Sequence, residues 1–383
     1  MKVRNGITAG LAGIAAVALA LNGPAATAAA TAGSWTETST GSVSAMTVAQ
    51  PTPRLTWVGG AEVTEDPDSG VVTFMPAMYE RDQDRNRSWR RVTLPGAKNW
   101  NSRINDIATA ADGSAFFVGD QPQDRSGVLV GRHTAGGWQL SSDNSMPAGV
   151  VESSLVSVSA LSGQDAWAVG GGYQQDTWDQ VPVVQRWNGK KWRSVTIPGS
   201  AHWLLTKVDE VAPDDVWVIG VDDATGQSLA VHWDGHTWKR TPTPVFPDSA
   251  VLFDIAARTP SDIWAVGWSR RTDKERPSGL VAHWDGKAWT EMPVPAGTFA
   301  LQSLTLRPKG GFAVTGGNDD AAVGLSWTPT AGWQSLGLPE NDPQHPLGAA
   351  DIASSGTGLT VAGWHYTSAD QGDSFVNGAI LTS

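Results

Sequence analysis

The feature that most constrains the fold of this chain is a unit that recurs along it. The unit is clearest in DDVWVIGVDDATGQSLAVHWDGHTWKRTPTP, at 214–244, and it returns with changes as QDAWAVGGGYQQDTWDQVPVVQRWNGKKWRSVTIP from Gln164 and as SDIWAVGWSRRTDKERPSGLVAHWDGKAWTEMPVP from Ser261. A repeat of this size is a supersecondary module that cannot bury its own apolar face and must stack on copies of itself. The sequence therefore predicts a repeat architecture.

Each copy contains four short segments in which β-branched and aromatic residues alternate with polar ones. In the central copy they are LLTKVDEV, VWVIG, LAVHW and TWKRT, and the third and fourth are joined by the turn pair Asp234-Gly235. Period-two alternation marks strands, and a residue pair of this kind marks a tight hairpin. Four antiparallel strands in about 48 residues describe one blade of a β-propeller.

Weaker copies continue the pattern in both directions, which makes the whole region after residue 32 one all-β domain of seven blades. The last copy supplies three strands, and Ser34-Trp35-Thr36 supplies a fourth strand without the first three. We expect this N-terminal strand to close the last blade, since an unclosed ring would expose a sheet edge. In the alternative, Trp35 lies in a loose tail and the fold has six complete blades and a partial one. The expected blades are 41–98, 99–148, 149–199, 200–246, 247–297, 298–341, and 342–383 with 33–40.

The recurring pattern WAVG, HWDG and a closing Trp resembles that of the secreted seven-bladed β-propellers of actinobacteria. It is less similar to the kelch, WD-repeat and Asp-box propellers: the WD signature is absent, and the Asp-Gly turn followed by Trp is shorter than an Asp-box. The resemblance covers almost the entire chain after residue 32 and implies a seven-bladed β-propeller. Because propellers have binding, catalytic and scaffolding roles, it assigns no functional residue.

Residues 1–32 have the order of a secretory signal peptide: Lys2 and Arg4, an apolar run from Ile7 to Leu21, a Gly-Pro break, and small residues around Ala28 to Ala32. We expect general secretory (Sec-type) export, cleavage and an extracellular protein, with an uncleaved anchor as the alternative. After cleavage no stable membrane insertion is expected.

Charge and composition exclude several classes of function. Loss of Lys2 and Arg4 changes the formal charge from -11 to -13, which argues against binding of nucleic acid or of an anionic membrane. The chain has no cysteine and seven histidines without ligand spacing, so we predict no disulfide, no metal site and no cofactor. A monomer is expected.

The connections between second and third strands, and those between blades, are long and varied, whereas the other connections are short. Long loops on a rigid scaffold commonly carry function, so we predict a ligand site on the long-loop face. Aromatic faces next to polar groups suit sugar rings or protein anchors. The candidate ligand-binding residues, for which packing between blades is the competing interpretation, are Trp100, Tyr173, Trp178, His202, Trp203 and Tyr366.

A second group of candidates falls at one repeat position of the first strands, which line the central channel. The aligned residues are Ala45, Asp106, Ser157, Lys207, Asp254, Ser303 and Asp351. If the protein is an enzyme, Asp106, Asp254 and Asp351 are the candidate catalytic acids, because grouped carboxylates can divide acid and base roles. The competing interpretation is that these polar residues hydrate the channel or cap strand ends.

From the sequence, the leading hypothesis is a secreted, non-catalytic propeller that binds an extracellular glycan or protein on its long-loop face. The first alternative is a hydrolase or lyase that acts on polysaccharide through the channel acids. The second is an extracellular scaffold for protein assembly.

Overall fold

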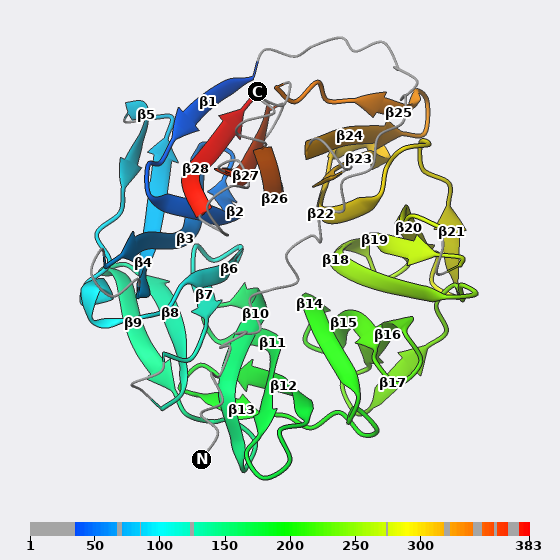
Figure 1. Cartoon of the computed structure of the whole chain (residues 1–383), viewed down its shortest axis with the longest axis horizontal. Coiled ribbons are helices and arrows are strands. Elements are labelled where there is room, and N and C mark those ends of the chain that lie inside the picture. The colour runs from blue at the N-terminus through cyan, green and yellow to red at the C-terminus, as the bar shows by residue number, and fades with distance from the viewer. Residues whose placement is uncertain are drawn as a thin grey trace, which may run out of the picture.

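The chain forms a ring of seven four-stranded antiparallel sheets around a central channel (Figure 1). The computed structural model describes residues 35–66, 71–84, 86–122, 126–272, 275–317, 322–339, 347–355, 358–366 and 375–383. The seven-bladed β-propeller expected from the repeat is therefore confirmed. Within the described ranges, no helix is long and apolar enough to cross a membrane.

The blades follow one another along the chain, and the strands of each run from the channel outward. Blade 1 is β2 (Val43–Thr52), β3 (Leu55–Glu65), β4 (Val72–Asp82) and β5 (Asn86–Arg91); blade 2 is β6 (Ile104–Thr109), β7 (Ala115–Gly119), β8 (Val128–Thr134) and β9 (Gly137–Asp143). Blade 3 is β10 (Val150–Ser162), β11 (Asp165–Gln174), β12 (Gln180–Trp187) and β13 (Trp192–Ser194); blade 4 is β14 (Trp203–Ala212), β15 (Asp215–Asp222), β16 (Gln227–Trp233) and β17 (Trp238–Thr241). Blade 5 is β18 (Ser249–Thr259), β19 (Asp262–Arg270), β20 (Ser278–Trp284) and β21 (Trp289–Met292); blade 6 is β22 (Ala300–Leu306), β23 (Phe312–Gly317), β24 (Ala322–Thr328) and β25 (Gly332–Ser335). Blade 7 is β26 (Leu347–Ser355), β27 (Gly358–Tyr366), β28 (Phe375–Thr382) and β1 (Thr36–Ser39), and two 3-10 turns lie at Ala97–Asn99 and Pro308–Gly310.

Blade 7 is assembled from both ends of the described chain, as expected. Strand β1 pairs antiparallel with β28 in the register Thr36 to Thr382 and Ser39 to Ala379. Trp35, just before the strand, donates its indole N–H to the carbonyl of Leu336 in blade 6 at 2.9 Å. The closure covers the edge of β28, which would otherwise be available for edge-to-edge pairing with another chain, and gives blade 7 the same four strands as the other blades.

The repeated tryptophans are the packing elements between blades. Trp217 of β15 contacts Trp284 and Trp289 of the next blade, with ring centroids 5.1 Å and 5.6 Å apart. Trp167 of β11 makes the same two contacts with Trp233 and Trp238. The second-strand Trp of one blade is thus covered by the third- and fourth-strand Trp of the next, and most of the repeat signature encodes this contact.

The turn pairs, such as Asp234-Gly235, form the tight hairpins between third and fourth strands. Gly235 has a φ of 85°, in the left-handed region that favours glycine, and the Asp234 carboxylate accepts the backbone N–H of Thr237 at 2.7 Å. These turns and the connections between first and second strands lie on one face of the ring. The connections between second and third strands, such as 175–179 in blade 3, lie on the other, which we call the long-loop face.

Candidate functional site

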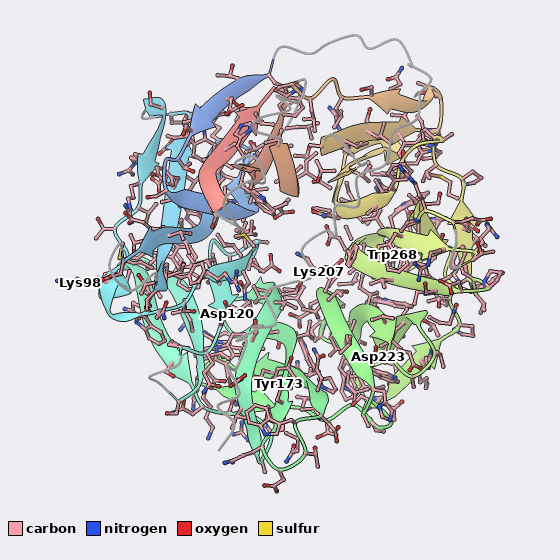
Figure 2. All side chains as sticks on the ribbon, in the orientation of Figure 1. Lys98, Asp120, Tyr173, Lys207, Asp223 and Trp268 are labelled. Carbon is pink, nitrogen blue, oxygen red and sulfur yellow. The ribbon has the colours of Figure 1, made fainter. Side chains whose placement is uncertain are left out.

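Seven equivalent side chains form a ring around the channel, each at the same place in an inner strand. They are Thr47, Asp106, Ser157, Lys207, Asp254, Ser303 and Asp351, and Figure 2 shows Lys207 at the channel. In every inner strand the pairing register shifts by one residue immediately before this position. The bulge turns the ring side chains toward one another, and all of them except Ser157 line a polar cavity of about 130 Å³.

One of the seven alignments made from sequence was wrong. The blade 1 member is Thr47 rather than Ala45, because Ala45 lies before the bulge, pairs with Gly60 and is 1% exposed in an apolar cluster. The sequence contained a signal for Thr47. It lies ten residues before Trp57, the same spacing that separates Lys207 from Trp217 and Asp254 from Trp264.

The ring residues join each blade to the next. In five of the seven blades the ring side chain accepts a hydrogen bond from a backbone N–H of the next blade. The donor is the residue that follows the ring position there. The five contacts of this kind are Asp106 with Val158 at 2.9 Å, Ser157 with Val208 at 3.2 Å, Asp254 with Leu304 at 2.8 Å, Ser303 with Ile352 at 3.3 Å and Asp351 with Val48 at 2.8 Å. Buried backbone donors need such partners, so these side chains are part of the joint between blades.

The other two joints follow from side-chain chemistry. Lys207 has no acceptor, and the hydroxyl of Thr47 is directed at two carboxylates, Asp106 at 3.3 Å and Asp351 at 3.2 Å. At these two joints the aspartate of the following blade accepts its own next N–H: Asp254 from Ile255 at 2.9 Å, and Asp106 from Ile107 at 3.0 Å. Every N–H at this level of the ring is therefore satisfied.

The electrostatics of the ring are those of a buried cluster with one cation and three acids. Lys207 Nζ lies 3.1 Å from Oδ2 of Asp106 and 3.9 Å from Oδ1 of Asp254. Burial alone would lower the pKa of Lys207, but the carboxylates of Asp106, Asp254 and Asp351 raise it above its ordinary value. Burial raises the pKa of Asp254 to about 6 and also raises the pKa of Asp351.

This geometry limits what the three acids can do chemically. Each of the six carboxylate oxygens of Asp106, Asp254 and Asp351 already accepts at least one hydrogen bond from the protein. A general acid or base needs an oxygen directed at the substrate. The structure places the three candidates in one cavity, and their contacts favour the joining of blades as their role. Among the described residues, no group of three or more His, Asp or Glu side chains is arranged to hold a metal ion.

On the long-loop face, blade 3 carries an aromatic pair that we call the blade 3 platform, Tyr173 and Trp178. Trp178 is 58% exposed, and its ring centroid is 6.2 Å from that of Tyr173. Within the described ranges it is the only aromatic residue among the exposed large hydrophobic side chains. Figure 2 labels Tyr173 on this blade and Asp223 on its neighbour.

The platform is held rigidly in an unusual backbone conformation. Trp178 has a φ of 60°, left-handed for a residue with a bulky side chain, which costs roughly 1–2 kcal/mol. Its N–H donates to the carbonyl of Gln174 at 2.7 Å, Gln174 N–H to that of Asp179 at 2.9 Å, and Gln175 N–H to that of Gly149 at 2.8 Å. Such strain persists only where surrounding contacts hold it.

The described chain has only one other non-glycine residue with positive φ, and it lies at the same end of the same blade. Glu152 has a φ of 46° and an exposed side chain. It lies in a bulge of β10 where residues 152 and 153 face Gly172, between the pairs Val151 to Tyr173 and Ser154 to Gly171. No motif or repeat position in the sequence marks Glu152.

The remaining ligand candidates are dispersed. Trp100 and Trp203 are 8% and 7% exposed and lie in the apolar clusters between blades. Their rings therefore do not face solvent, and the competing interpretation of packing between blades describes both. His202 is exposed in the connection between blades 3 and 4. Tyr366 ends β27, and its side chain lies outside the described residues. Only Tyr173 and Trp178 of the six candidates are in one hairpin.

Comparisons with known proteins identify the fold. No protein-family model and no curated protein matches the sequence. Among solved structures, the chain is similar to virginiamycin B lyase from Staphylococcus aureus, with a TM-score of 0.57 and 9% identity over 91% of this chain and 100% of that one. It is also similar to YCF48 bound to D1 peptide, with a TM-score of 0.55 and 14% identity over 91% and 96% of the two chains.

A third similar structure is the β-propeller domain of the Trilobed protease from Pyrococcus furiosus, described as having an open velcro topology. The TM-score is 0.50 and the identity 7%, over 87% of this chain and 96% of that one. Blade 7 of the present chain is instead closed by β1. At these identities the likeness establishes the β-propeller fold alone.

Proposed function

We propose that this protein is a binding propeller that recognises an extracellular glycan through the blade 3 platform. The observation that carries the proposal is the exposed Trp178, held in a left-handed conformation by the three backbone hydrogen bonds of its hairpin. A tryptophan that is mostly exposed and lies in none of the apolar clusters between blades is informative, because large aromatic side chains normally bury most of their surface. Sugar rings present C–H faces that stack on such a ring.

The energetics agree with a binding role. Covering the exposed part of an indole is worth about 2–3 kcal/mol, from the usual area of a buried aromatic and the free energy per unit of apolar area. Because the hairpin is already ordered, little of that free energy is lost in fixing the side chain on binding. Removal of the ring should therefore weaken binding by roughly 30- to 100-fold.

The test is a binding panel of cellulose, xylan, chitin and mannan with the wild type and Trp178→Ala. The control is Val245→Ala. Val245 is 79% exposed in the connection between blades 4 and 5, so this substitution removes exposed apolar surface away from the platform. We expect the wild type and the control to bind a member of the panel and Trp178→Ala to lose that binding. Equal binding by all three proteins would contradict the assignment of the platform as the binding site. Absence of binding by the wild type would contradict the proposal that the ligand is a glycan.

The alternative of a polysaccharide hydrolase or lyase has less support. Its favourable observation is the gathering of Asp106, Asp254 and Asp351 in one polar cavity. Against it stands the use of their oxygens in the joints between blades. Depolymerisation of any polymer in the panel that is lost in Asp254→Asn while the protein stays folded would favour the alternative.

Export is part of the proposal and rests on the pattern of residues 1–32. Mass spectrometry of the protein secreted by a bacterial host tests it. A mature N-terminus between residues 28 and 33 in the medium is expected, and retention of the intact chain in the membrane would contradict export.

A further inference from the structure

Glu152 and Trp178 share a structural support, which links the two strained positions to one another. The hairpin that carries Trp178 is fixed to the segment before β10 by the hydrogen bond from Gln175 N–H to the carbonyl of Gly149. Residue 149 is three positions before Glu152. Two costly backbone conformations that adjoin in this way are more readily explained by a common site than by independent accidents of folding.

The bulge that holds Glu152 is clamped from the neighbouring blade. Ser153 N–H donates to the side-chain oxygen of Gln121 at 3.1 Å, and Gln121 N–H donates to the carbonyl of Ser153 at 2.8 Å. The hydroxyl of Ser154 donates to Asp120 at 2.6 Å. Residues 153 and 154 are thus anchored in blade 2, and Glu152 must point away from the blade interface into solvent.

The three residues form a row across the end of blade 3. Glu152 lies on the inner strand β10, Tyr173 lies on β11 beside it, and Trp178 lies in the hairpin beyond. Neighbouring strands are about 4.8 Å apart, so the row spans on the order of 10 Å. That length suits a short oligosaccharide better than a single sugar.

The carboxylate of Glu152 is available to a ligand. It is exposed, and it forms no salt bridge and no hydrogen bond with the described residues. An ionised carboxylate only accepts hydrogen bonds, and it can accept two at once from neighbouring hydroxyls. Beside an aromatic surface it therefore recognises hydroxyl groups and repels other anions.

We infer that Glu152 is the specificity-determining residue of the blade 3 platform, and that the platform takes an uncharged glycan. This inference rests on the proposed function. Hydroxyls at one end of the ligand donate to Glu152 while a ring face at the other end stacks on Trp178. A like charge about 4 Å away weakens binding by at least about fivefold even in water, so acidic glycans are disfavoured.

The test compares the neutral polymer from the panel that the wild type binds with the carboxymethylated form of the same polymer. We expect the wild type to prefer the neutral form by about fivefold or more. In Glu152→Gln, which keeps the shape and removes the charge, this ratio should fall toward one. Trp178→Ala should lose both polymers. An unchanged ratio in Glu152→Gln would overturn the inference and leave the proposed function standing, whereas loss of neither polymer in Trp178→Ala would remove the proposed function.

A second variant excludes a merely structural role. Glycine adopts positive φ without steric cost, so Glu152→Gly relieves the strain while removing the carboxylate. We expect a melting temperature at or above that of the wild type together with weaker binding of the neutral polymer. A lower melting temperature with unchanged affinity would show that Glu152 serves the fold, and would contradict the inference. Binding of a lysine-rich peptide instead of any polymer would contradict the glycan class.

Discussion

Lys207 on the inner strand of blade 4 forms an ion pair with Asp106 on the inner strand of blade 2, at 3.1 Å and across the intervening blade 3. Lys207 also lies 3.9 Å from Asp254 of blade 5. The one cation of the channel ring thus connects blades that do not adjoin. Its removal would leave three buried acids without a countercharge.

We predict that Lys207→Met destabilises the protein by about 3–5 kcal/mol, because breaking one side of a buried pair leaves an uncompensated charge. Denaturant unfolding measures this difference. Lys239→Met is the control, since Lys239 is exposed and pairs with Asp234 at 2.6 Å on the surface; it should cost under about 1 kcal/mol. The double variant Lys207→Met/Asp106→Asn should recover part of the loss. Equal stability of Lys207→Met and the wild type would show that the ring does not hold the blades.

When the acids of the ring are ionised, the hydroxyls of Thr47 and Ser303 have too few protons for the contacts that they make with carboxylate oxygens. The Ser303 hydroxyl is 2.5 Å from Asp351 and 3.0 Å from Asp254, and the Thr47 hydroxyl contacts Asp351 and Asp106. A hydroxyl has one proton, so two protons serve four contacts. Protonation of Asp254 and Asp351 would supply the missing two and would leave Asp106 balanced by Lys207.

The pH dependence follows from this arrangement. The pKa of Asp254 is raised to about 6 in the folded protein, chiefly by burial, and the pKa of Asp351 is also raised. A raised folded pKa contributes stability that is present below the unfolded value, near 4, and is lost as pH rises through about 6. The free-energy advantage of the wild type over Asp254→Asn should therefore be larger at pH 4.5 than at pH 8, by about 2 kcal/mol. A difference independent of pH would contradict the assigned protonation.

Glu210 provides a separate test at higher pH. Its side chain is 5% exposed, and its carboxylate oxygens lack a hydrogen-bond partner of good geometry among the described residues. Burial, with the nearby charge of Asp165, raises the pKa of Glu210 to about 8. Its contribution to stability is lost as pH rises toward 8, so Glu210→Gln should gain on the wild type by at least about 1 kcal/mol between pH 6 and pH 9. Thermal melts at the two pH values measure the gain, and a constant difference would argue against burial of the charge.

The tryptophans separate into two classes that mutation distinguishes. Trp203→Ala empties a buried site between blades 3 and 4 and should cost about 3–5 kcal/mol, with any glycan binding retained under conditions where the protein stays folded. Trp178→Ala should leave stability within about 1 kcal/mol and abolish binding. Loss of binding without loss of stability in Trp203→Ala would reverse the assignment.

The sequence predicted the fold well because blade packing is periodic. The Trp contacts, the turn pairs and six of the seven ring positions repeat at fixed spacing and can be aligned. The burial of a Trp in a polar connection does not follow from the repeat. Trp203 is buried by side chains of two blades, whereas Trp178 is exposed by the local path of one hairpin. Glu152 could not be predicted, since its bulge is held by Gln121, a residue of another blade and of no repeat position.

Trp178→Gly tests most directly whether Trp178 is exposed and strained for binding. Glycine removes the ring and relieves the positive φ in one substitution. The measurement is the affinity of this variant for the neutral polymer that the wild type binds, on protein whose melting temperature is recorded beside that of the wild type. We predict an affinity lower by roughly 30-fold or more, with a melting temperature at or above that of the wild type. Undiminished affinity, or a loss that accompanies a lower melting temperature, would contradict it.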